Sequence, residues 1–462
     1  VNSGNLPTVS YLVAPKNFSD HPSAPWYGAW YVSEALEILT KNPEVWKKTI
    51  FILNYDENDG YFDHVPPFVP PKPNDPNAGK VSKGVDARTE FVFKEQEENY
   101  PGMDPEDVRE SPVGLGDGVP IVVASPWSRG GWVNSEVCDI SSTIMFMEKF
   151  LSHKTGKKIR EENISSWRRT ISGDLTSVFR PFNGEKIELP NFLTMESHVK
   201  KILNASYKDI PDNFKILTES EVSQVNNSHL QSPILPKQEP GTKPSNALAY
   251  ELYVDGEINP SRKAIVLNLE ASNKKFGDKA LGAPFLIYAP GAFKNPTTNA
   301  FETASNWSFA VKPGDKLDYE WPLDAFEGGL YHLQVYGPNG YYREFKGNKN
   351  DPQLSLVSSY TVDGGDNKTG IYKLDIENLS NTMLSIKVTD NAYQHGKKTI
   401  DLKPGEKKPV RVPTVKSQGW YDFTLIADGN DAFSRRYCGR LELGKDSISD
   451  PLMGGEMSIN LS

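Results

Sequence analysis

The stretch Thr49-Ile-Phe-Ile-Leu-Asn-Tyr-Asp-Glu-Asn-Asp-Gly-Tyr-Phe-Asp-His64 changes character abruptly in its middle. Thr49 to Leu53 is an unbroken run of β-favouring apolar residues, which predicts a strand buried on both faces of a parallel sheet. The run gives way to the polar sequence Asp56-Glu-Asn-Asp59, and Gly60 follows. In open α/β sheets, ligands and catalytic groups gather beyond the carboxyl ends of the strands. The stretch therefore predicts a functional site at the edge of a sheet.

The neighbouring sequence alternates helical and strand patterns. A helix is predicted within residues 24–46, and a second buried strand over Val119-Pro-Ile-Val-Val-Ala124. Asp139 is a suitable N-cap for a helix that continues through Phe150. Because this alternation is typical of a parallel sheet covered by helices, residues 1–215 are predicted to form an α/β domain.

The carboxy-terminal half repeats itself. Lys312-Pro-Gly-Asp315 recurs as Lys403-Pro-Gly-Glu406, 91 residues later. Tyr341-Tyr-Arg-Glu-Phe-Lys-Gly347 recurs as Phe433-Ser-Arg-Arg-Tyr-Cys-Gly439, 92 residues later. Segments of alternating polarity between these motifs predict half-buried strands joined by turns. Two tandem copies of one all-β domain are the simplest account, and sandwich and barrel both stay open.

A composition change near residue 216 separates the two halves, because the following residues are polar and rich in proline. The predicted division is an α/β domain over 1–215, a linker over 216–246, β-repeats over 247–350 and 351–446, and a tail over 447–462.

The composition excludes several classes of protein. The chain has 51 basic and 60 acidic residues and a net charge of -9, which argues against a general nucleic-acid binder. No apolar run approaches the ~20 residues of a membrane span. The two cysteines, Cys138 and Cys438, cannot build a disulfide framework, and no Cys/His spacing suggests zinc. Residues 1–20 show no signal-peptide pattern and begin with Val1, so we expect a processed or truncated product.

Two interpretations of Asp56 and Glu57 stay open at this point. Asp, Asn and Gly are ordinary turn formers at the end of a strand. An EF-hand is excluded, since Gly60 takes the fifth position of such a loop and Pro67 the position of the bidentate Glu. Two adjacent carboxylates against a buried strand would repel each other, however, unless a cation or basic group compensates them. This repulsion favours a functional pair.

Two histidines accompany the acidic cluster. His64 follows Asp63 directly, and this position favours a functional role over that of a structural, hydrogen-bonded histidine. His21 lies in Asp20-His-Pro-Ser23, where a loop residue fixed by the following proline is the alternative.

Three arginines also stand out. Arg129, in the loop Ser125-Pro-Trp-Ser-Arg-Gly-Gly-Trp132, follows a predicted strand and could bind an anionic substrate, although a surface arginine in a glycine-rich turn is an equal alternative. Arg168 and Arg169 are expected to form a structural ion pair with Asp174.

These motifs resemble the bacterial phospholipase C family, whose relatives include acid phosphatases with an alkaline-phosphatase-like fold. The resemblance implies a partial alkaline-phosphatase-like α/β domain followed by two all-β, sandwich-like domains. It covers essentially the whole chain, and the matching segments are His21-Pro22, Asn54-Tyr-Asp-Glu-Asn-Asp-Gly-Tyr-Phe-Asp-His-Val-Pro-Pro67, Val119-Pro120, Ser125-Pro-Trp-Ser-Arg-Gly-Gly-Trp-Val-Asn-Ser135, Ser166-Trp-Arg-Arg169, Gly173-Asp-Leu-Thr-Ser177 and Pro236-Lys-Gln-Glu-Pro-Gly241.

The resemblance also implies an activity, namely metal-assisted hydrolysis of the phosphodiester of phosphatidylcholine-like lipids. Asp56 and Glu57 would bind a divalent metal ion of unknown identity, which would polarise the phosphoryl oxygens. His21 and His64 would contact the phosphoryl group or the leaving oxygen. The implied partners are a phospholipid or phosphocholine-ester substrate and a peripheral membrane surface, and the implied location is secreted or periplasmic.

Two departures from the family pattern change the expectation for this chain. No Glu-Asn pair and no Ser or Thr nucleophile motif precedes His21, so the missing amino-terminal portion of the same protein is an expected partner. Cys138-Asp-Ile-Ser141 stands where relatives read Phe-Asp-His-Thr, so Ile140 replaces a histidine. We therefore expect little esterase activity and weak metal binding from the chain alone. An acid-phosphatase-type phosphomonoesterase and a non-catalytic binding or structural module remain as alternatives.

Overall fold

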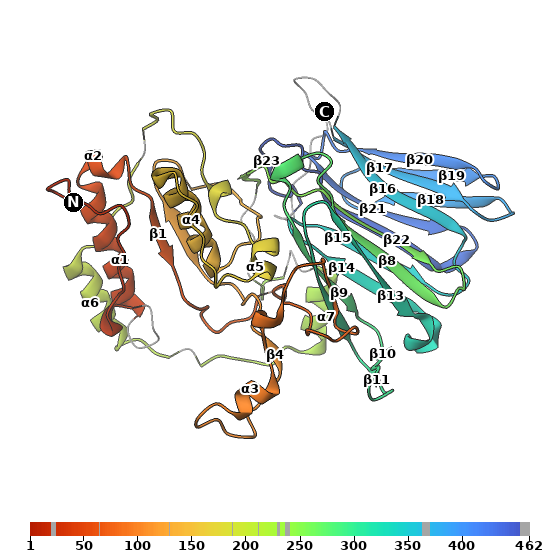
Figure 1. The fold of residues 1–462 in the computed structure, drawn as a ribbon, viewed down its shortest axis with the longest axis horizontal. Helices are drawn as coiled ribbons and strands as arrows, with labels where there is room; N and C mark the ends of the chain where they lie inside the picture. Colours follow the sequence, from red (N-terminus) through yellow and green to blue (C-terminus); the bar gives the residue numbers. More distant parts are fainter. Residues whose placement is uncertain are drawn as a thin grey trace. The chain divides into compact units, whose positions relative to one another are not determined.

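A computed structural model gives the fold of the chain (Figure 1). It describes residues 1–19, 25–63, 65–128, 130–186, 188–210, 212–228, 232–235, 241–362 and 370–452. The chain forms two compact units, which we call the N-terminal unit (Val1–Asn54, Ile121–Gly130 and Val178–Gln238) and the β-rich unit (Tyr55–Pro120, Gly131–Ser177 and Glu239–Ser462).

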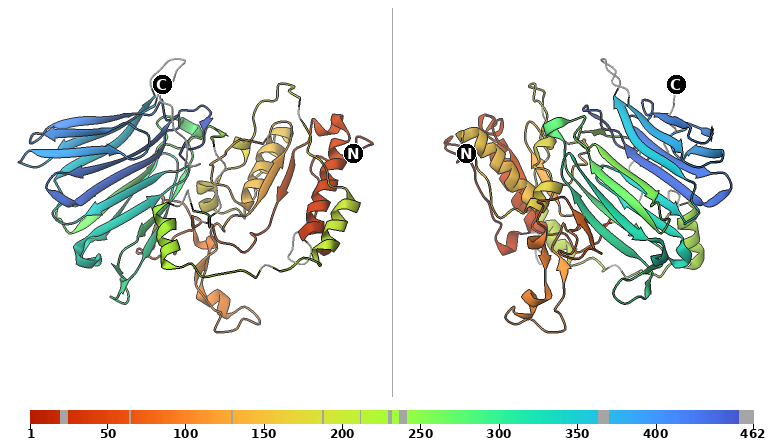
Figure 2. Two further views of the ribbon diagram at one scale, coloured as in Figure 1. Left: turned by 180° about the vertical axis from the view of Figure 1, so that it is seen from behind. Right: turned by 45° about the vertical axis from the view of Figure 1, so that its right-hand side comes forward.

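The N-terminal unit is built mainly from helices. Its main elements are α1 (Pro25–Thr40), α2 (Pro43–Trp46), β1 (Phe51–Asn54), β5 (Ile121–Ala124), α6 (Met195–Ala205) and α7 (Glu219–Asn227). Helices α1 and α6 lie side by side in both figures, and the His198 ring Nε2 lies 2.6 Å from the Trp26 carbonyl oxygen (Figures 1 and 2). The predicted helix is confirmed, and it ends before Asn42, whose side chain caps α2.

The predicted parallel sheet is wrong for these two strands. β1 and β5 pair antiparallel, with Phe51 opposite Ala124 and Asn54 opposite Ile121. Parallel neighbours need a crossover, usually a helix that packs on the sheet. The described residues between β1 and β5 contain the five-residue α3 (Lys94–Glu98), the three-residue 3-10 helix η2 (Arg88–Glu90) and the short strands β2 (Gly79–Val81), β3 (Phe91–Val92) and β4 (Ser111–Pro112). The connection therefore supplies no such crossover.

The expected burial of β1 is also wrong. Its apolar residues are half-buried, and on β5 Ile121 and Val122 are 38% and 50% exposed. No hydrophobic side chain in the described part of the N-terminal unit is fully buried. The apolar run thus predicts the strand correctly but not its surroundings.

The β-rich unit contains both β-repeats. The first repeat comprises β7 (Leu252–Ile258), β8 (Ala264–Ala271), β9 (Ala283–Ala289), β12 (Ser305–Val311), β13 (Asp315–Pro322), β14 (Tyr331–Tyr336) and β15 (Tyr342–Gly347). The second repeat comprises β16 (Leu354–Val362), β17 (Gly370–Asn378), β18 (Leu384–Asp390), β19 (Lys397–Leu402), β20 (Lys407–Pro413), β21 (Trp420–Ala427) and β22 (Asn430–Arg440). The first repeat also carries a small hairpin of β10 (Phe293–Lys294) and β11 (Phe301–Glu302), and β6 (Pro244–Ser245) pairs with β23 (Ser447–Ile448).

The strand order shows two similar sandwiches that share one sheet. Nine strands run in the order β19-β18-β21-β22-β15-β14-β9-β12-β2, and two three-stranded sheets, β13-β8-β7 and β16-β17-β20, complete the two repeats. Each repeat encloses its own hydrophobic core. The mixed α/β part followed by an antiparallel β region confirms the predicted fold class.

The two repeats meet along the β15–β22 pair, which we call the seam. Glu344 lies opposite Arg436, 92 positions further along, so the repeats are related by an approximate twofold axis at this pair. Arg343 lies opposite Tyr437, and Arg435 lies opposite Phe345 in the symmetric arrangement. Both of these arginines are buried, each over the face of an aromatic ring.

Part of the phosphoesterase-like sequence belongs to the β-rich unit. β2 adds to the edge of the nine-stranded sheet by pairing parallel with β12. At this contact Gly79 has a φ of +120°, and a Cβ there would lie 1.9 Å from the Ser308 carbonyl oxygen, so only glycine fits. Helices α4 (Ile140–Thr155) and α5 (Ser166–Ile171) belong to the same unit. The domain boundaries expected from composition stay a prediction.

Two further sequence predictions bear on this region. Asp139 is the N-cap of α4 as predicted, and it accepts a hydrogen bond from the Ser141 hydroxyl at 2.7 Å. Both cysteines are free thiols.

Among the described residues, no helix combines the length and apolarity that a membrane span requires.

Candidate functional site

Asp56 and Glu57 lie directly beyond the end of β1. The strand pairing extends one residue past Asn54, where the Tyr55 amide donates to the Pro120 carbonyl at 3.2 Å. The chain then bends, and the side chains of Asp56 and Glu57 are both exposed. The sequence thus predicts correctly that the two acids follow a strand end.

The rest of the acidic cluster has a structural role. The Asn58 side chain accepts a hydrogen bond from the Gly60 amide at 2.9 Å, and the Asp59 carboxylate accepts one from the Tyr61 amide at 3.0 Å. Gly60 has a φ of +85°, a left-handed conformation that glycine adopts at little cost. These hydrogen bonds are the ones expected of Asx turns. Asn58, Asp59 and Gly60 therefore shape the loop that presents Asp56 and Glu57.

The exposure of Asp56 and Glu57 weakens the repulsion between their carboxylates. Water screens the repulsion of two exposed carboxylates, so their adjacency requires no compensating charge. Within the described residues, neither acid forms an ion pair or a side-chain hydrogen bond. The support for a functional pair is therefore the motif itself and not the cost of its burial.

The donor chemistry of this pair suits a divalent cation, but the described residues do not make a complete site. Carboxylate oxygens are the ligands that hard divalent cations prefer. No group of three His, Cys, Asp or Glu side chains in the described ranges could hold a metal ion. His21 and His64, the two predicted active-site histidines, lie outside the described residues.

The loop after β5 is tightly organised by its serines. The Ser125 hydroxyl oxygen accepts hydrogen bonds from the amides of Trp127 and Ser128, at 3.2 and 3.0 Å. The Ser128 hydroxyl donates to the Val123 carbonyl at 2.8 Å. Ser125 is buried, so these contacts fix the turn at the strand end. Arg129, the predicted anion-binding residue of this loop, lies outside the described residues.

A buried charge network centres on Arg168 in the β-rich unit. Its Nε lies 2.9 Å from both carboxylate oxygens of Glu90, its Nη2 donates to the Gly114 carbonyl at 3.0 Å, and its Nη1 pairs with Asp139. Glu90 and Asp139 are both largely hidden from solvent. Removing two carboxylates and a guanidinium from water is costly, so the geometry of all three is mutually constrained.

The predicted pairing of Arg168 and Arg169 with Asp174 is wrong. Arg169 binds Glu148 through two contacts of 2.9 and 2.7 Å, and Asp174 pairs with Lys149. Sequence reasoning missed Glu90 as the partner of Arg168 because 78 residues separate the two, and no local pattern marks it. The one available signal was the N-cap position of Asp139, which places a carboxylate at the start of α4.

The start of α4 is where the chain departs from the family pattern. Ile140 is the first residue of the helix, and its side chain is 49% exposed. Next to it, burial raises the pKa of the Cys138 thiol to about 12, so this thiol stays protonated at neutral pH. Burial likewise raises the pKa of Glu136, whose carboxylate accepts a hydrogen bond from the Ser177 hydroxyl. No acid/base group is available at position 140 itself.

Two family models match this chain. The model described as "Phosphoesterase family" matches residues 1–152, and the model described as "Bacterial phospholipase C, C-terminal domain" matches residues 244–348 and again 354–440. The second model thus matches each β-repeat once.

Curated relatives agree with these matches. Over 98% of this chain, it is 34% identical to the "Non-hemolytic phospholipase C" and 32% identical to the "Hemolytic phospholipase C" of Pseudomonas aeruginosa. The "Phospholipase C B" of Mycobacterium tuberculosis is 38% identical over 39% of the chain and 30% of its own length. The chain covers 59% and 58% of the two Pseudomonas relatives, and so spans about three fifths of their length. On the agreement of both family models and of these relatives, the chain belongs to the bacterial phospholipase C family of phosphoesterases.

Proposed function

We propose that this chain serves phospholipase C-type hydrolysis, in which the phosphodiester of a phosphatidylcholine-like lipid is cleaved. One observation carries the proposal: the family motif Asn54–Pro67 follows a strand end and presents Asp56 and Glu57 to solvent. The phospholipase C names of relatives that match 98% of the chain support the same reaction class. Those names support a phospholipid substrate, and the phosphatidylcholine-like head group is proposed from the resemblance of the family motif.

In this proposal, Asp56 and Glu57 supply oxygen ligands for a divalent cation, and His21 and His64 act on the phosphoryl group or the leaving oxygen. Such a cation, when bound, would stabilise the charge that develops on the phosphoryl oxygens. Since the described residues offer only two adjacent carboxylates, the remaining ligands must come from elsewhere. We therefore propose that metal binding and turnover by the chain alone are weak, and that further polypeptide completes the site.

The metal arm is tested by titrating the chain with Mn²⁺, Ca²⁺ or Zn²⁺ alone in a calorimeter. We expect weak binding that disappears in Asp56→Asn and in Glu57→Gln. Glu95→Gln is the matched control, because Glu95 is an exposed acid in α3 of the same unit. Binding that is tight, or that survives both site substitutions, would overturn the assignment of these ligands.

The activity arm compares p-nitrophenylphosphorylcholine, a diester, with p-nitrophenyl phosphate, a monoester. Each is offered to the chain alone and to the chain mixed with a polypeptide corresponding to the part of the relatives that it does not span. We expect little turnover from the chain alone and diester hydrolysis from the mixture. Preference for the monoester would favour an acid-phosphatase-type enzyme. A normal rate from the chain alone would show that it needs no completion.

A second candidate is a non-catalytic binding or structural module. The observation that favours it is Ile140, which puts an apolar side chain where the family pattern has a histidine. If the completed protein hydrolyses neither ester, while Ile140→His restores turnover, the module interpretation describes the natural chain better.

A further inference from the structure

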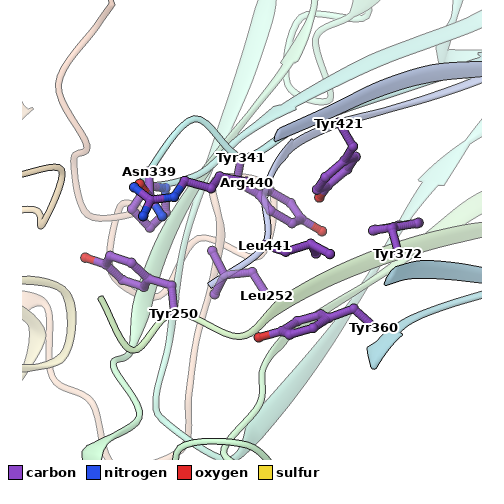
Figure 3. A pocket seen from close by; sticks show the side chains of 10 residues that line it. Tyr250, Leu252, Asn339, Tyr341, Tyr360, Tyr372, Tyr421, Arg440 and Leu441 are labelled. Atoms are coloured by element: carbon purple, nitrogen blue, oxygen red, sulfur yellow. The ribbon is translucent and has the colours of Figure 1, made fainter. Parts of the chain in front are cut away.

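Two cavities lie at opposite ends of the seam. The first, of ≈ 20 Å³, adjoins Tyr341 before the start of β15 and Arg440 at the end of β22 (Figure 3). The second, of ≈ 260 Å³, adjoins Phe433 near the start of β22 and Asp351 just after β15. Because β15 and β22 run antiparallel, the approximate twofold axis at Glu344 exchanges the two positions.

Residues at matching positions of the two repeats line the two cavities. Tyr341 lines the first cavity and Phe433, 92 residues later, lines the second. Leu252, the first residue of β7, lines the first cavity, and Leu354, the first residue of the corresponding strand β16, lines the second. The same architectural position is therefore almost closed in one case and open in the other.

Side-chain size explains the difference. Tyrosine side chains crowd the first cavity (Figure 3). Tyr360, Tyr372 and Tyr421 come from β16, β17 and β21, and Tyr250 and Tyr341 lie just before β7 and β15. The second cavity has smaller residues in its wall, including Ile258, Pro352, Leu354 and Leu356. Since an interior of this kind is normally packed to high density, a space of ≈ 260 Å³ can accommodate a small molecule.

Apolar and polar residues share the wall of the second cavity, and the polar ones are Glu257, Asn259, Arg262, Asp351, Gln353 and Arg435. Leu354, Leu356 and Phe433 are buried and line its interior, and Leu379, on the turn after β17, lies at its rim with 55% of its surface exposed. Leu354 and Leu356 are already buried, so an apolar group that enters the cavity would mainly remove the exposed surface of Leu379 from water, which is favourable. A chain of methylene groups fits this chemistry.

Among the described residues, Arg262 is a cation at this cavity with no ionic partner. Arg435 is compensated by Asp351, at 3.1 Å. Arg262 uses its Nε and one Nη2 donor to bind the carbonyls of Lys349 and Asp351, at 2.7 and 2.6 Å. No carboxylate of the described residues lies within ion-pair distance of Arg262. The remaining N–H groups of its guanidinium take no part in these two hydrogen bonds. Glu257 is exposed, so water screens its charge more than that of the half-buried arginine.

We propose that this cavity binds an anionic amphiphile, whose head group pairs with Arg262 and whose chain lies along Leu354, Leu356 and Leu379. A fatty-acid carboxylate and a lipid phosphate share this chemistry. The proposal does not rest on the proposed function, because every residue it uses lies in the β-repeats and none belongs to the Asp56 motif.

The test is calorimetric titration of the whole chain with dodecanoate and with dodecyl phosphate, each below its critical micelle concentration. We expect one molecule bound per chain. Tighter binding of dodecanoate would indicate a fatty-acid carboxylate as the ligand, and tighter binding of dodecyl phosphate a lipid phosphate. Arg262→Gln should weaken binding about tenfold or more, as expected for the loss of a charge-assisted contact. Leu379→Glu should weaken it as well, and because Leu379 is exposed this variant is expected to fold even if Arg262→Gln does not.

Leu330→Glu is the matched control, since Leu330 is 58% exposed in the same unit but does not line the cavity. The proposal is overturned if dodecyl phosphate binds Leu379→Glu as tightly as the natural chain. It is also overturned if Leu330→Glu weakens binding as much as Leu379→Glu does. Equal or tighter binding of dodecylphosphocholine, whose head group is zwitterionic, overturns its anionic part. Binding of inorganic phosphate as tight as that of dodecyl phosphate overturns the role of the apolar wall.

Discussion

Apolar strand residues are buried in the β-rich unit and only partly buried in the N-terminal unit. In the β-rich unit, β9 has the sequence Ala-Pro-Phe-Leu-Ile-Tyr-Ala and all but one of its residues are buried. In the N-terminal unit, β1 has the sequence Phe-Ile-Leu-Asn and none of its residues is fully buried. The sequence signal is of the same kind in both cases.

The difference shows that burial depends on what surrounds a strand. β9 is hydrogen-bonded on both sides, to β12 and β14, and the opposing sheet covers one of its faces. β1 pairs only with β5 in the described structure, and a two-stranded sheet is marginal without further packing. Apolar side chains also remain exposed on the helices of the N-terminal unit: Trp26, Ile38, Met195 and Leu203. The N-terminal unit thus has the residues of a core without an enclosed core.

The largest test of this comparison substitutes one large apolar residue in each unit. Trp321 is 1% exposed in the core of the first repeat, and Trp321→Ala should lower the free energy of unfolding by about 4 kcal/mol. Val122 is 50% exposed on β5, and Val122→Ala should cost less than about 1 kcal/mol. Denaturant unfolding of both variants gives the two values. Equal costs would show that the N-terminal unit does have an enclosed interior.

A second test concerns charge. Arg168→Ala leaves the carboxylates of Glu90 and Asp139 without their cation and should destabilise the β-rich unit by about 3 kcal/mol. Arg88→Ala is the matched control in the same unit, because Arg88 and its partner Asp86 are both well exposed, and it should change little. A small effect of Arg168→Ala would mean that the network relaxes easily.

A third test uses pH at the seam. Hydrogen bonds from His332, and then from Lys346, lower the pKa of Glu344 to about 2, against 4.5 for the free side chain. A depressed carboxyl pKa stabilises the folded state above pH 4.5, and this contribution disappears as the pH falls toward 2. The difference in unfolding free energy between the natural chain and Glu344→Gln should therefore be about 1 kcal/mol at pH 6 and shrink steadily below pH 4.5. A difference that does not vary between pH 6 and pH 3 would contradict this assignment.

The smallest expected effect lies in the acidic loop. Because Asp56 is exposed and unpaired among the described residues, Asp56→Asn should alter the free energy of unfolding by less than about 0.5 kcal/mol. Thermal unfolding without metal provides the measurement, and the same variant is the one expected to lose metal binding. A large loss of stability would show that Asp56 holds the loop together and that its role is structural.

Sequence reasoning succeeded where local patterns suffice. The end of α1 before Asn42-Pro43, the capping role of Asp139 and the duplication of the β-domain are all visible over short spans or at a constant offset. It failed where two distant segments decide. The antiparallel pairing of β1 with β5 depends on the path of the chain between them, and the link from Arg168 to Glu90 spans 78 residues.

The candidate site divides in the same way. The position of Asp56 and Glu57 after a strand could be predicted, since a strand and its end are local features. Their exposure could not be predicted, because it depends on which other segments pack around the loop. Repulsion between the two carboxylates would be costly if they were buried, but both are exposed.

What the sequence determined alone is the inventory of strands, the duplication and the family motif, since each depends on side-chain periodicity or residue order. What the tertiary structure decided is which apolar runs are covered and how the repeats join. It also decided that one end of the seam is packed with tyrosines while the other is open. Burial and cavity volume depend on residues that are distant in the sequence and close in space. The hydrophobic free energy depends on the apolar surface that these residues bury together, and this surface cannot be read from single residues.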